Sequence, residues 1–272
     1  MLRHMLKTVL AIALVSLVNV GSSRADDLYR AQTIVTGTGE PNRLEALGPL
    51  LEEVLIKVSG VQKLAGDAQL APFKAKARDD VGAYSYHDQM SGIPIHDEQG
   101  TRDRPYDLTV DFDPARIADV LKSLGLKPWD AHRPVIAVFA GIQQGTNSFV
   151  VAADGDRGTD QRDSLVSTAS KRGVPIVLPA TNNLTKAGID AAKLAKAEPS
   201  SLASVVAGKS SEAMLIGQLA WNDRKLDWSA QWRIYWRGKT HGWQLRAPTY
   251  DEAFRRGIGG VAQLMSGNGE PK

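Results

Sequence analysis

The sequence predicts a mixed α+β protein made of two small modules, the second containing a mixed sheet covered by helices. Strand-like runs and amphipathic helical patterns follow one another along the chain after residue 26. A proline-flanked segment interrupts them at residues 127–134. Near the C-terminus the hydrophobic spacing changes from a helical pattern to strict alternation. The second sheet is therefore expected to open with a βαβ unit and to end as an antiparallel meander.

The composition is typical of a globular protein. Of the 272 residues, 43% are hydrophobic and 23% are charged, which argues against intrinsic disorder. Cysteine is absent, so the sequence excludes disulfide bonds, thiolate nucleophiles, cysteine-ligated metals and a lipid-modified cysteine anchor.

Residues 1–25 have the three parts of a signal peptide. A basic start precedes the apolar run 8–20, and small residues lead to a cleavage point between Ala25 and Asp26. The apolar run is shorter than the ~20 residues that a membrane-spanning helix needs. A cleaved leader and export are therefore expected in preference to an uncleaved anchor.

Cleavage changes the charge balance of the chain. The full sequence has 33 Lys and Arg residues against 30 Asp and Glu residues, and Arg3, Lys7 and Arg24 belong to the leader. The mature chain would carry 30 charges of each sign, so the pI near 9.0 describes the precursor and gives no support for nucleic-acid binding. No later run reaches 18 apolar residues, and no integral membrane segment is expected after processing.

The first strand and helix have clear signals. Residues 28–37 are rich in β-branched side chains and predict a strand. The helix that follows has apolar residues three and four apart and ends at Gly60. Asn42, with Glu45 three residues later, fits a capped start, whereas Pro49 indicates either a kink or a start at that residue.

The N-terminal module is expected over residues 26–126. Its remaining elements are a weaker helix at 67–77, strands at 81–86 and 106–112, and a helix that Asp113 caps and Gly125 ends.

Residues 127–134 are the predicted connector, and the C-terminal module is expected over 135–268. The unbroken apolar run 135–142 is typical of a central strand covered on both faces, and 149–152 can pair with it. A helix at 161–172, a strand at 174–179 and two helical pieces over 184–208 are expected next. The meander follows, with strands at 214–221, 226–237 and 243–247 and a turn at 238–242. A final helix begins with a capping box of Thr249 and Glu252.

Tryptophans are concentrated in the predicted meander. Trp228, Trp232 and Trp236 fall on one face of their strand. They could form an aromatic platform for sugar rings, or a core beneath the final helix. The core is favoured because the helix carries a stripe of small residues that would let it approach bulky rings; the stripe consists of Ala253, Gly257 and Gly260.

Three segments carry a resemblance to a bacterial family. They are EEVLIKVSG (52–60), GLKPWDAHRP (125–134) and RGVPIVLP (172–179). Together they resemble the exported, uncharacterised family catalogued as domain of unknown function 2066. The resemblance implies the periplasm of a Gram-negative cell and brings no established reaction, substrate or catalytic residue. Family members often carry acidic residues after the last of these segments, where this chain has residues 180–183 (ATNN), so an acidic site is not expected there.

The sequence lacks patterns typical of catalytic, cofactor and metal sites. It contains no nucleophile elbow, phosphate loop or H-E-x-x-H arrangement. The nearest approach to a metal site is His87-Asp88 with His96-Asp97-Glu98 in one polar region. Of the carboxylates Asp111 and Asp113, the second is already explained as a helix cap. We therefore predict no catalytic residue, no cofactor and no metal.

Two functions remain open. The first is a non-catalytic periplasmic accessory or interaction protein whose partner is another envelope protein. The alternative is a glycan- or envelope-polymer-binding protein, or a weak hydrolase of such a polymer, that uses a tryptophan platform. The residues proposed for a binding surface are Trp129, His132, Trp221 and Trp243.

Overall fold

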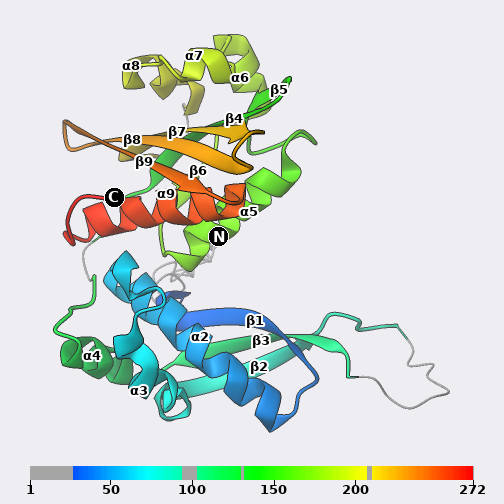
Figure 1. The fold of residues 1–272 in the computed structure, drawn as a ribbon, viewed down its shortest axis with the longest axis vertical. Coiled ribbons are helices and arrows are strands. Elements are labelled where there is room, and N and C mark those ends of the chain that lie inside the picture. Colours follow the sequence, from blue (N-terminus) through cyan, green and yellow to red (C-terminus); the bar gives the residue numbers. More distant parts are fainter. Residues whose placement is uncertain (1–26, 94–102, 130–131, 207–209, 272) are drawn as a thin grey trace, which may run out of the picture.

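The computed structural model describes residues 27–93, 103–129, 132–206 and 210–271 (Figure 1). The predicted signal peptide, its cleavage site at Ala25–Asp26 and the loop with His96 lie outside these residues. Two sheets with helices packed against them confirm the mixed α+β class. No described helix has both the length and the apolar composition needed to span a lipid bilayer.

The first sheet is antiparallel, with strand order β1-β3-β2. Its strands are β1 (Arg30–Thr36), β2 (Val81–Asp88) and β3 (Pro105–Phe112). Helices α2 (Glu40–Ser59) and α4 (Pro114–Ser123) contribute to the hydrophobic core on one face. The short elements around them are η1 (Asp27–Tyr29), η2 (Gln62–Leu64), η3 (Ala68–Leu70), α3 (Ala71–Lys74) and η4 (Ala77–Asp80).

Helix α2 differs from the prediction at its start. It begins at Glu40 after Gly39, which offers no side-chain cap, and it continues through Pro49. Proline is well tolerated in the first turn, where Pro41 lies. The bond that Pro49 cannot make is offset by the burial of leucines on both sides of it. The predicted cap Asn42 instead donates its side-chain amide to the carbonyl of Thr36 in β1.

The second sheet has strand order β5-β4-β7-β8-β9, with β6 also paired to β4. Its strands are β4 (Ile136–Gln144), β5 (Asn147–Val150), β6 (Ile176–Val177), β7 (Ala213–Asn222), β8 (Asp227–Trp236) and β9 (Lys239–Ala247). Strand β4 runs parallel to β6 and β7, and the other pairs are antiparallel, so the βαβ start and the meander end are confirmed.

Two details of this sheet differ from the prediction. Strand β6 has two residues instead of the six expected over 174–179, because prolines at 175 and 179 cannot donate to a ladder. The β8–β9 turn is tighter than 238–242. Arg237 and Gly238 both have positive φ, as the two central residues of a tight hairpin turn require, and pairing resumes at Lys239.

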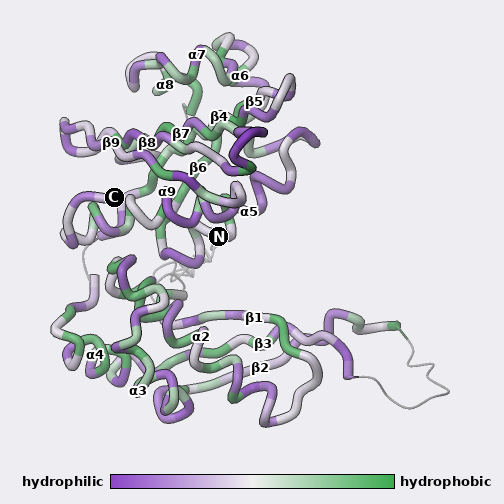
Figure 2. Tube along the Cα trace, in the orientation of Figure 1, coloured by the Kyte–Doolittle hydropathy of each residue, from purple (hydrophilic) through white to green (hydrophobic). Residues whose placement is uncertain are grey.

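Helices cover both faces of this sheet (Figure 1). Helices α5 (Thr159–Lys171) and α9 (Tyr250–Met265) lie on one face. The other face is covered by α6 (Thr181–Ala187), α7 (Ala191–Leu194), α8 (Pro199–Ala203) and the short η5 (Ser204–Val206). Residues of β4 alternate between the two hydrophobic cores, which confirms the central strand; Val138 belongs to one core and Phe139 to the other. In Figure 2 the middle of this sheet is hydrophobic, whereas α5 is largely hydrophilic.

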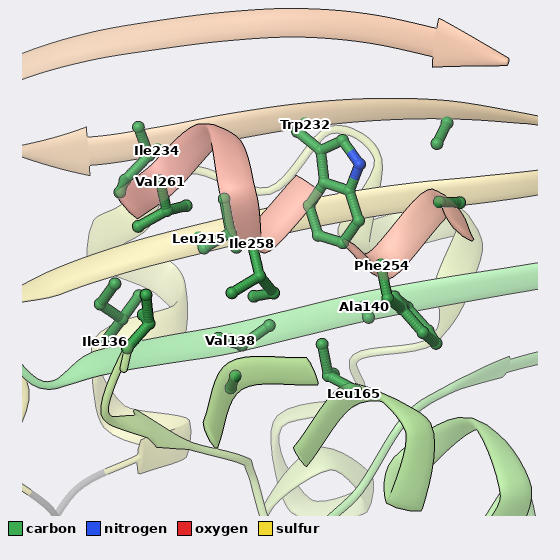
Figure 3. Packing of buried hydrophobic residues seen from close by; sticks show 14 of the residues in the cluster. Ile136, Val138, Ala140, Leu165, Leu215, Trp232, Ile234, Phe254, Ile258 and Val261 are labelled. Carbon is green, nitrogen blue, oxygen red and sulfur yellow. The ribbon is translucent and has the colours of Figure 1, made fainter. Parts of the chain in front are cut away.

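The tryptophans of β8 belong mainly to the core. Trp232 is 1% exposed and points toward α9, where its ring centroid lies 6.3 Å from that of Phe254 (Figure 3). Trp228 is also buried, so the core interpretation is confirmed for both rings. Trp236, at the end of β8, is only partly buried, with the guanidinium of Arg237 4.5 Å from its ring centroid.

The two halves contact each other through the connector and the C-terminal segment. The backbone N–H of Trp129 donates to the carbonyl of Val58 at 2.7 Å. The side-chain amide of Asn268 donates to the carbonyl of Ser59 at 3.0 Å. The division into separate modules at 127–134 stays a prediction.

Candidate functional site

The four residues proposed for a binding surface do not share an exposed face. Trp129 and Trp243 are 7% and 6% exposed and belong to the hydrophobic core. Trp221 is partly buried, and its Nε1 donates to Asp223 at 2.9 Å. His132 is exposed and lies 2.7 Å from a carboxylate oxygen of Glu212. The geometry therefore does not favour a tryptophan platform built on these residues.

The histidines are dispersed over the described structure. His87 lies 3.4 Å from Asp107, and His241 lies 3.0 Å from Glu270. No group of three or more potential metal-binding side chains occurs within the described ranges. The other part of the predicted loop site, at His96, lies outside those ranges.

The carboxylates Asp111 and Asp113 have structural partners. Asp111 forms an ion pair with Arg30 at 2.7 Å. Asp113 accepts hydrogen bonds from the N–H groups of Ala115 and Arg116, which confirms the predicted cap of α4. Asp111 therefore links two paired strands, and Asp113 caps a helix.

A polar groove between the two halves is the candidate site. One side is residues 30–34 of β1, with Glu53 and Lys57 of α2 beside it. Asp107 and Thr109 of β3 also line the groove, and three residues of α5 in the other half complete the lining; they are Ser167, Ser170 and Lys171. The hollow has a volume of about 820 Å³, within the range of pockets that hold ligands. It lies where β1 faces the C-terminal half in Figure 1.

The groove continues along β1 toward its C-terminal end. Here the lining residues of α2 are Asn42, Glu45, Ala46, Pro49, Leu50 and Glu53. Lys171 of α5 borders this part as well, and Thr36 closes the strand side. The groove therefore follows nearly the whole length of β1.

No strand among the described residues pairs with the edge of β1 inside this groove. Within the first sheet β1 pairs only with β3. Gly37 donates its N–H to Arg104 at 2.7 Å, and Pro105, opposite Thr36, has no N–H to donate. Since backbone groups alternate in direction along an antiparallel strand, the odd-numbered residues of β1 bond to β3. The even-numbered residues direct their N–H and C=O groups toward the groove.

Side chains of α2 cover the two ends of this edge. Lys57 Nζ donates to the carbonyl of Arg30 at 2.6 Å, and the Asn42 amide donates to the carbonyl of Thr36. Between them lie Gln32 and Ile34. In the part of the chain that the structure describes, no hydrogen bond reaches the edge-facing backbone groups of these two residues. The side chain of Ile34 is 62% exposed.

The charged groups of the groove differ in burial. Burial raises the pKa of Glu53, although Lys171, Lys57 and Arg172 act in the opposite direction. Arg172, next to Lys171 but not part of the groove lining, is buried; burial lowers its pKa, and the nearby Arg255 lowers it further. Lys171 is exposed and forms no ion pair with any described residue. It is the cation of the groove that is available to a ligand.

The sequence predicted β1 but not the groove. The edge position of β1 follows from the order β1-β3-β2, in which the strand that pairs with it lies about 75 residues later in the chain. The wall formed by α5 comes from the other half. The one local signal was the alternation of exposed side chains, polar except for Ile34, with buried Ala31 and Val35, and this pattern is equally typical of a solvated sheet face.

Comparisons with known proteins give limited similarity. Residues 23–130 match the model of a family described as Domain of unknown function (DUF8605). This is a different family from domain of unknown function 2066, and the match shows that the earlier resemblance was wrong. No curated protein matches.

Among solved structures, the C-terminal domain of LpoB from Salmonella enterica is similar to part of the chain. The identity is 11% and the TM-score is 0.28, over 44% of this chain and 87% of that domain. A likeness of this size supports no conclusion about fold, partner or function.

Proposed function

We propose that the mature chain is an exported, non-catalytic accessory protein of the bacterial envelope that binds another envelope protein in the groove beside β1. The N-terminal pattern of residues 1–25 supports export to the periplasm. The single observation that carries the binding role is the open edge of β1 within a groove lined by α2 and α5.

The lining favours a polypeptide over a sugar polymer. Sugar rings stack on exposed aromatic faces, and Trp129, Trp232 and Trp243 are buried in the core. A row of open backbone donors and acceptors instead suits an extended polypeptide, whose own backbone presents the complementary groups at the same spacing.

Site-specific photocrosslinking in the native host tests the binding role. A photoreactive amino acid at Gln32 or Lys171 should give an adduct with the same envelope protein, identified by mass spectrometry. Val166, on the same helix as Lys171, is 47% exposed and does not line the groove, so it serves as the matched control. Equal adducts from Val166, or no protein adduct from either groove position, would contradict the proposal.

The export part of the proposal has its own measurement. Intact-mass analysis of the protein from a periplasmic fraction should show a chain that begins at Asp26. A retained leader, or a protein that stays with the membrane fraction after a salt wash, would contradict export with cleavage.

A further inference from the structure

We infer that the groove takes one extended peptide segment, which adds to β1 as a fourth strand of the first sheet and places an acidic side chain beside Lys171. This inference rests on the proposed function and adds the mode of binding and the chemistry of the partner. Four features of the described residues support it in turn.

The first feature is the set of open backbone donors and acceptors on the edge of β1. Gln32 and Ile34 each direct an N–H and a C=O toward the groove. They are two residues apart, which is the repeat of a strand. A peptide in extended conformation can therefore make up to four main-chain hydrogen bonds with them. Strand addition to an open sheet edge is a recurrent mode of peptide recognition.

The ends of the edge limit the length of the segment. The carbonyl of Arg30 already accepts from Lys57, and the carbonyl of Thr36 accepts from Asn42. From Arg30 to Thr36 the strand is about 20 Å long at ~3.3 Å per residue. The fully bonded part of a ligand is thus expected to be short, with its flanking residues resting against α2.

The shape of the groove selects a single segment over a second copy of this chain. Pairing brings adjacent strands to about 4.8 Å. The edge of β1 lies in a hollow that α5 also lines, and in Figure 1 β1 lies just below the C-terminal half. The β1 strand of a second copy would lie in the same kind of hollow. The residues that line the two hollows would therefore collide before the two β1 strands came close enough to pair. An extended peptide segment that does not lie in a hollow of its own can enter the groove and reach β1.

The charge of Lys171 indicates which kind of side chain the ligand should carry at one position. Ser167, Ser170 and Lys171 are spaced three and four apart, so they share one face of α5, the face that lines the groove. Lys171 is exposed and without an ion pair among the described residues. Two carboxylates line this part of the groove, and both have partners. Glu53 is largely buried and lies 4.0 Å from Lys57, whereas Asp107 lies 3.4 Å from His87 and accepts a hydrogen bond from Gln89. An acidic ligand side chain is therefore the complement of Lys171.

The test uses purified protein from residue 26 onward and a phage-displayed library of random linear heptapeptides. Selected peptides are synthesised, and their Kd is measured by fluorescence anisotropy. Ile34→Pro removes an N–H that points into the groove and leaves the odd-numbered bonds to β3 in place, a substitution that edge strands tolerate. Ile34→Ala keeps the N–H and is the matched control.

We expect Ile34→Pro to weaken binding at least tenfold, and Ile34→Ala to change it less than threefold. Lys171→Ala should weaken binding of peptides that contain Asp or Glu, with a larger effect at low salt. Should Ile34→Pro lower the unfolding midpoint, peptides N-methylated at alternate residues provide the same test from the ligand side. One of the two methylation patterns should abolish binding.

The outcomes separate the binding mode from the proposed function. Equal binding by Ile34→Pro and the parent, or by both N-methylated series, would overturn strand addition. The partner role would survive that result if crosslinks from Lys171 persist. Failure to select any peptide that depends on Ile34 or Lys171 would overturn the inference, and loss of the crosslinks as well would overturn the proposed function with it.

Discussion

Gly257 of α9 lies directly against the indole of Trp232 in β8. A Cβ atom on Gly257 would be 2.3 Å from Cε2 of that ring. Gly217 of β7 meets the same ring from the sheet, where a Cβ would be 2.3 Å from Cζ3. The two glycines therefore leave the space that the buried indole fills, and α9 can pack closely on the sheet because position 257 has no side chain.

Substitution of this glycine should destabilise the protein. Gly257→Ala places a methyl group against a buried ring that cannot shift, and overpacking of this kind typically costs about 1–3 kcal/mol. Gly259→Ala is the control on the same helix. Its Cβ would meet the end of the flexible Gln62 side chain, which can move aside. Both variants gain helix propensity. We expect the midpoint of denaturant unfolding to fall for Gly257→Ala only, and equal midpoints would contradict this packing.

Removal of the ring itself should have a larger effect. Trp232→Ala leaves a cavity in the core, and such changes cost about 3–5 kcal/mol. Gln231→Ala, on the exposed face of the same strand, should change stability little. Chemical denaturation followed by circular dichroism measures both free energies of unfolding. Parent-like stability of Trp232→Ala would show that the indole is not part of the core.

Arg133 joins the two halves and should be sensitive to substitution. Its guanidinium donates to the carbonyls of Lys57 and Gly173, both at 2.9 Å, and lies 4.0 Å from the ring centroid of Trp129. Arg133→Ala removes charge-assisted hydrogen bonds, each of which contributes on the order of 1.5–3 kcal/mol.

The control is the adjacent His132, which is exposed and whose side chain hydrogen-bonds only to Glu212 among the described residues. His132→Ala should leave the unfolding midpoint nearly unchanged. Thermal unfolding of the two variants provides the comparison, and a similar loss in both would show that the link between the halves does not depend on Arg133.

Glu53 should make stability depend on pH. Burial raises its pKa above the ordinary value of 4.5, so between pH 4.5 and the raised pKa the folded state holds a proton that the unfolded state has released. Its contribution to stability is therefore full below 4.5 and is lost as pH rises through the raised pKa. Glu53→Gln keeps the side-chain volume and removes the titration.

The difference between parent and variant isolates Glu53 from other groups, such as Asp80, whose pKa is also raised by burial. We expect the free energy of unfolding of Glu53→Gln to fall less between pH 4.5 and 7 than that of the parent. Parallel pH profiles from urea unfolding would contradict the account of a largely buried carboxyl in the groove.

The elements that the sequence predicted well have local causes. The alternation in 226–237 indicates a strand with one buried face, and the apolar run 135–142 indicates a strand buried on both faces. The structure has β8 and β4 at these positions. The Asp113 cap and the Gly60 terminator depend only on neighbouring backbone groups. Such signals can be interpreted without knowing the rest of the fold.

The features that the sequence did not predict depend on contacts between different elements of the fold. Asn42 was expected to cap α2, but its amide bonds to Thr36 at the sheet edge. Trp129 and Trp243 were proposed for a binding surface, and both rings are buried in the hydrophobic core of the second half. The open edge of β1 requires the order of three strands and the position of α5. None of these follows from spacing within one segment.

The most direct test of partner recognition at β1 is residue-resolved amide hydrogen exchange by NMR, with and without a selected heptapeptide. The N–H groups of Thr33 and Val35 bond to β3 and should be protected in both states. Those of Gln32 and Ile34 should exchange quickly in the free protein and become protected in the complex. If the peptide binds while the exchange of Gln32 and Ile34 stays unchanged, the groove beside β1 is not where this protein receives an added strand.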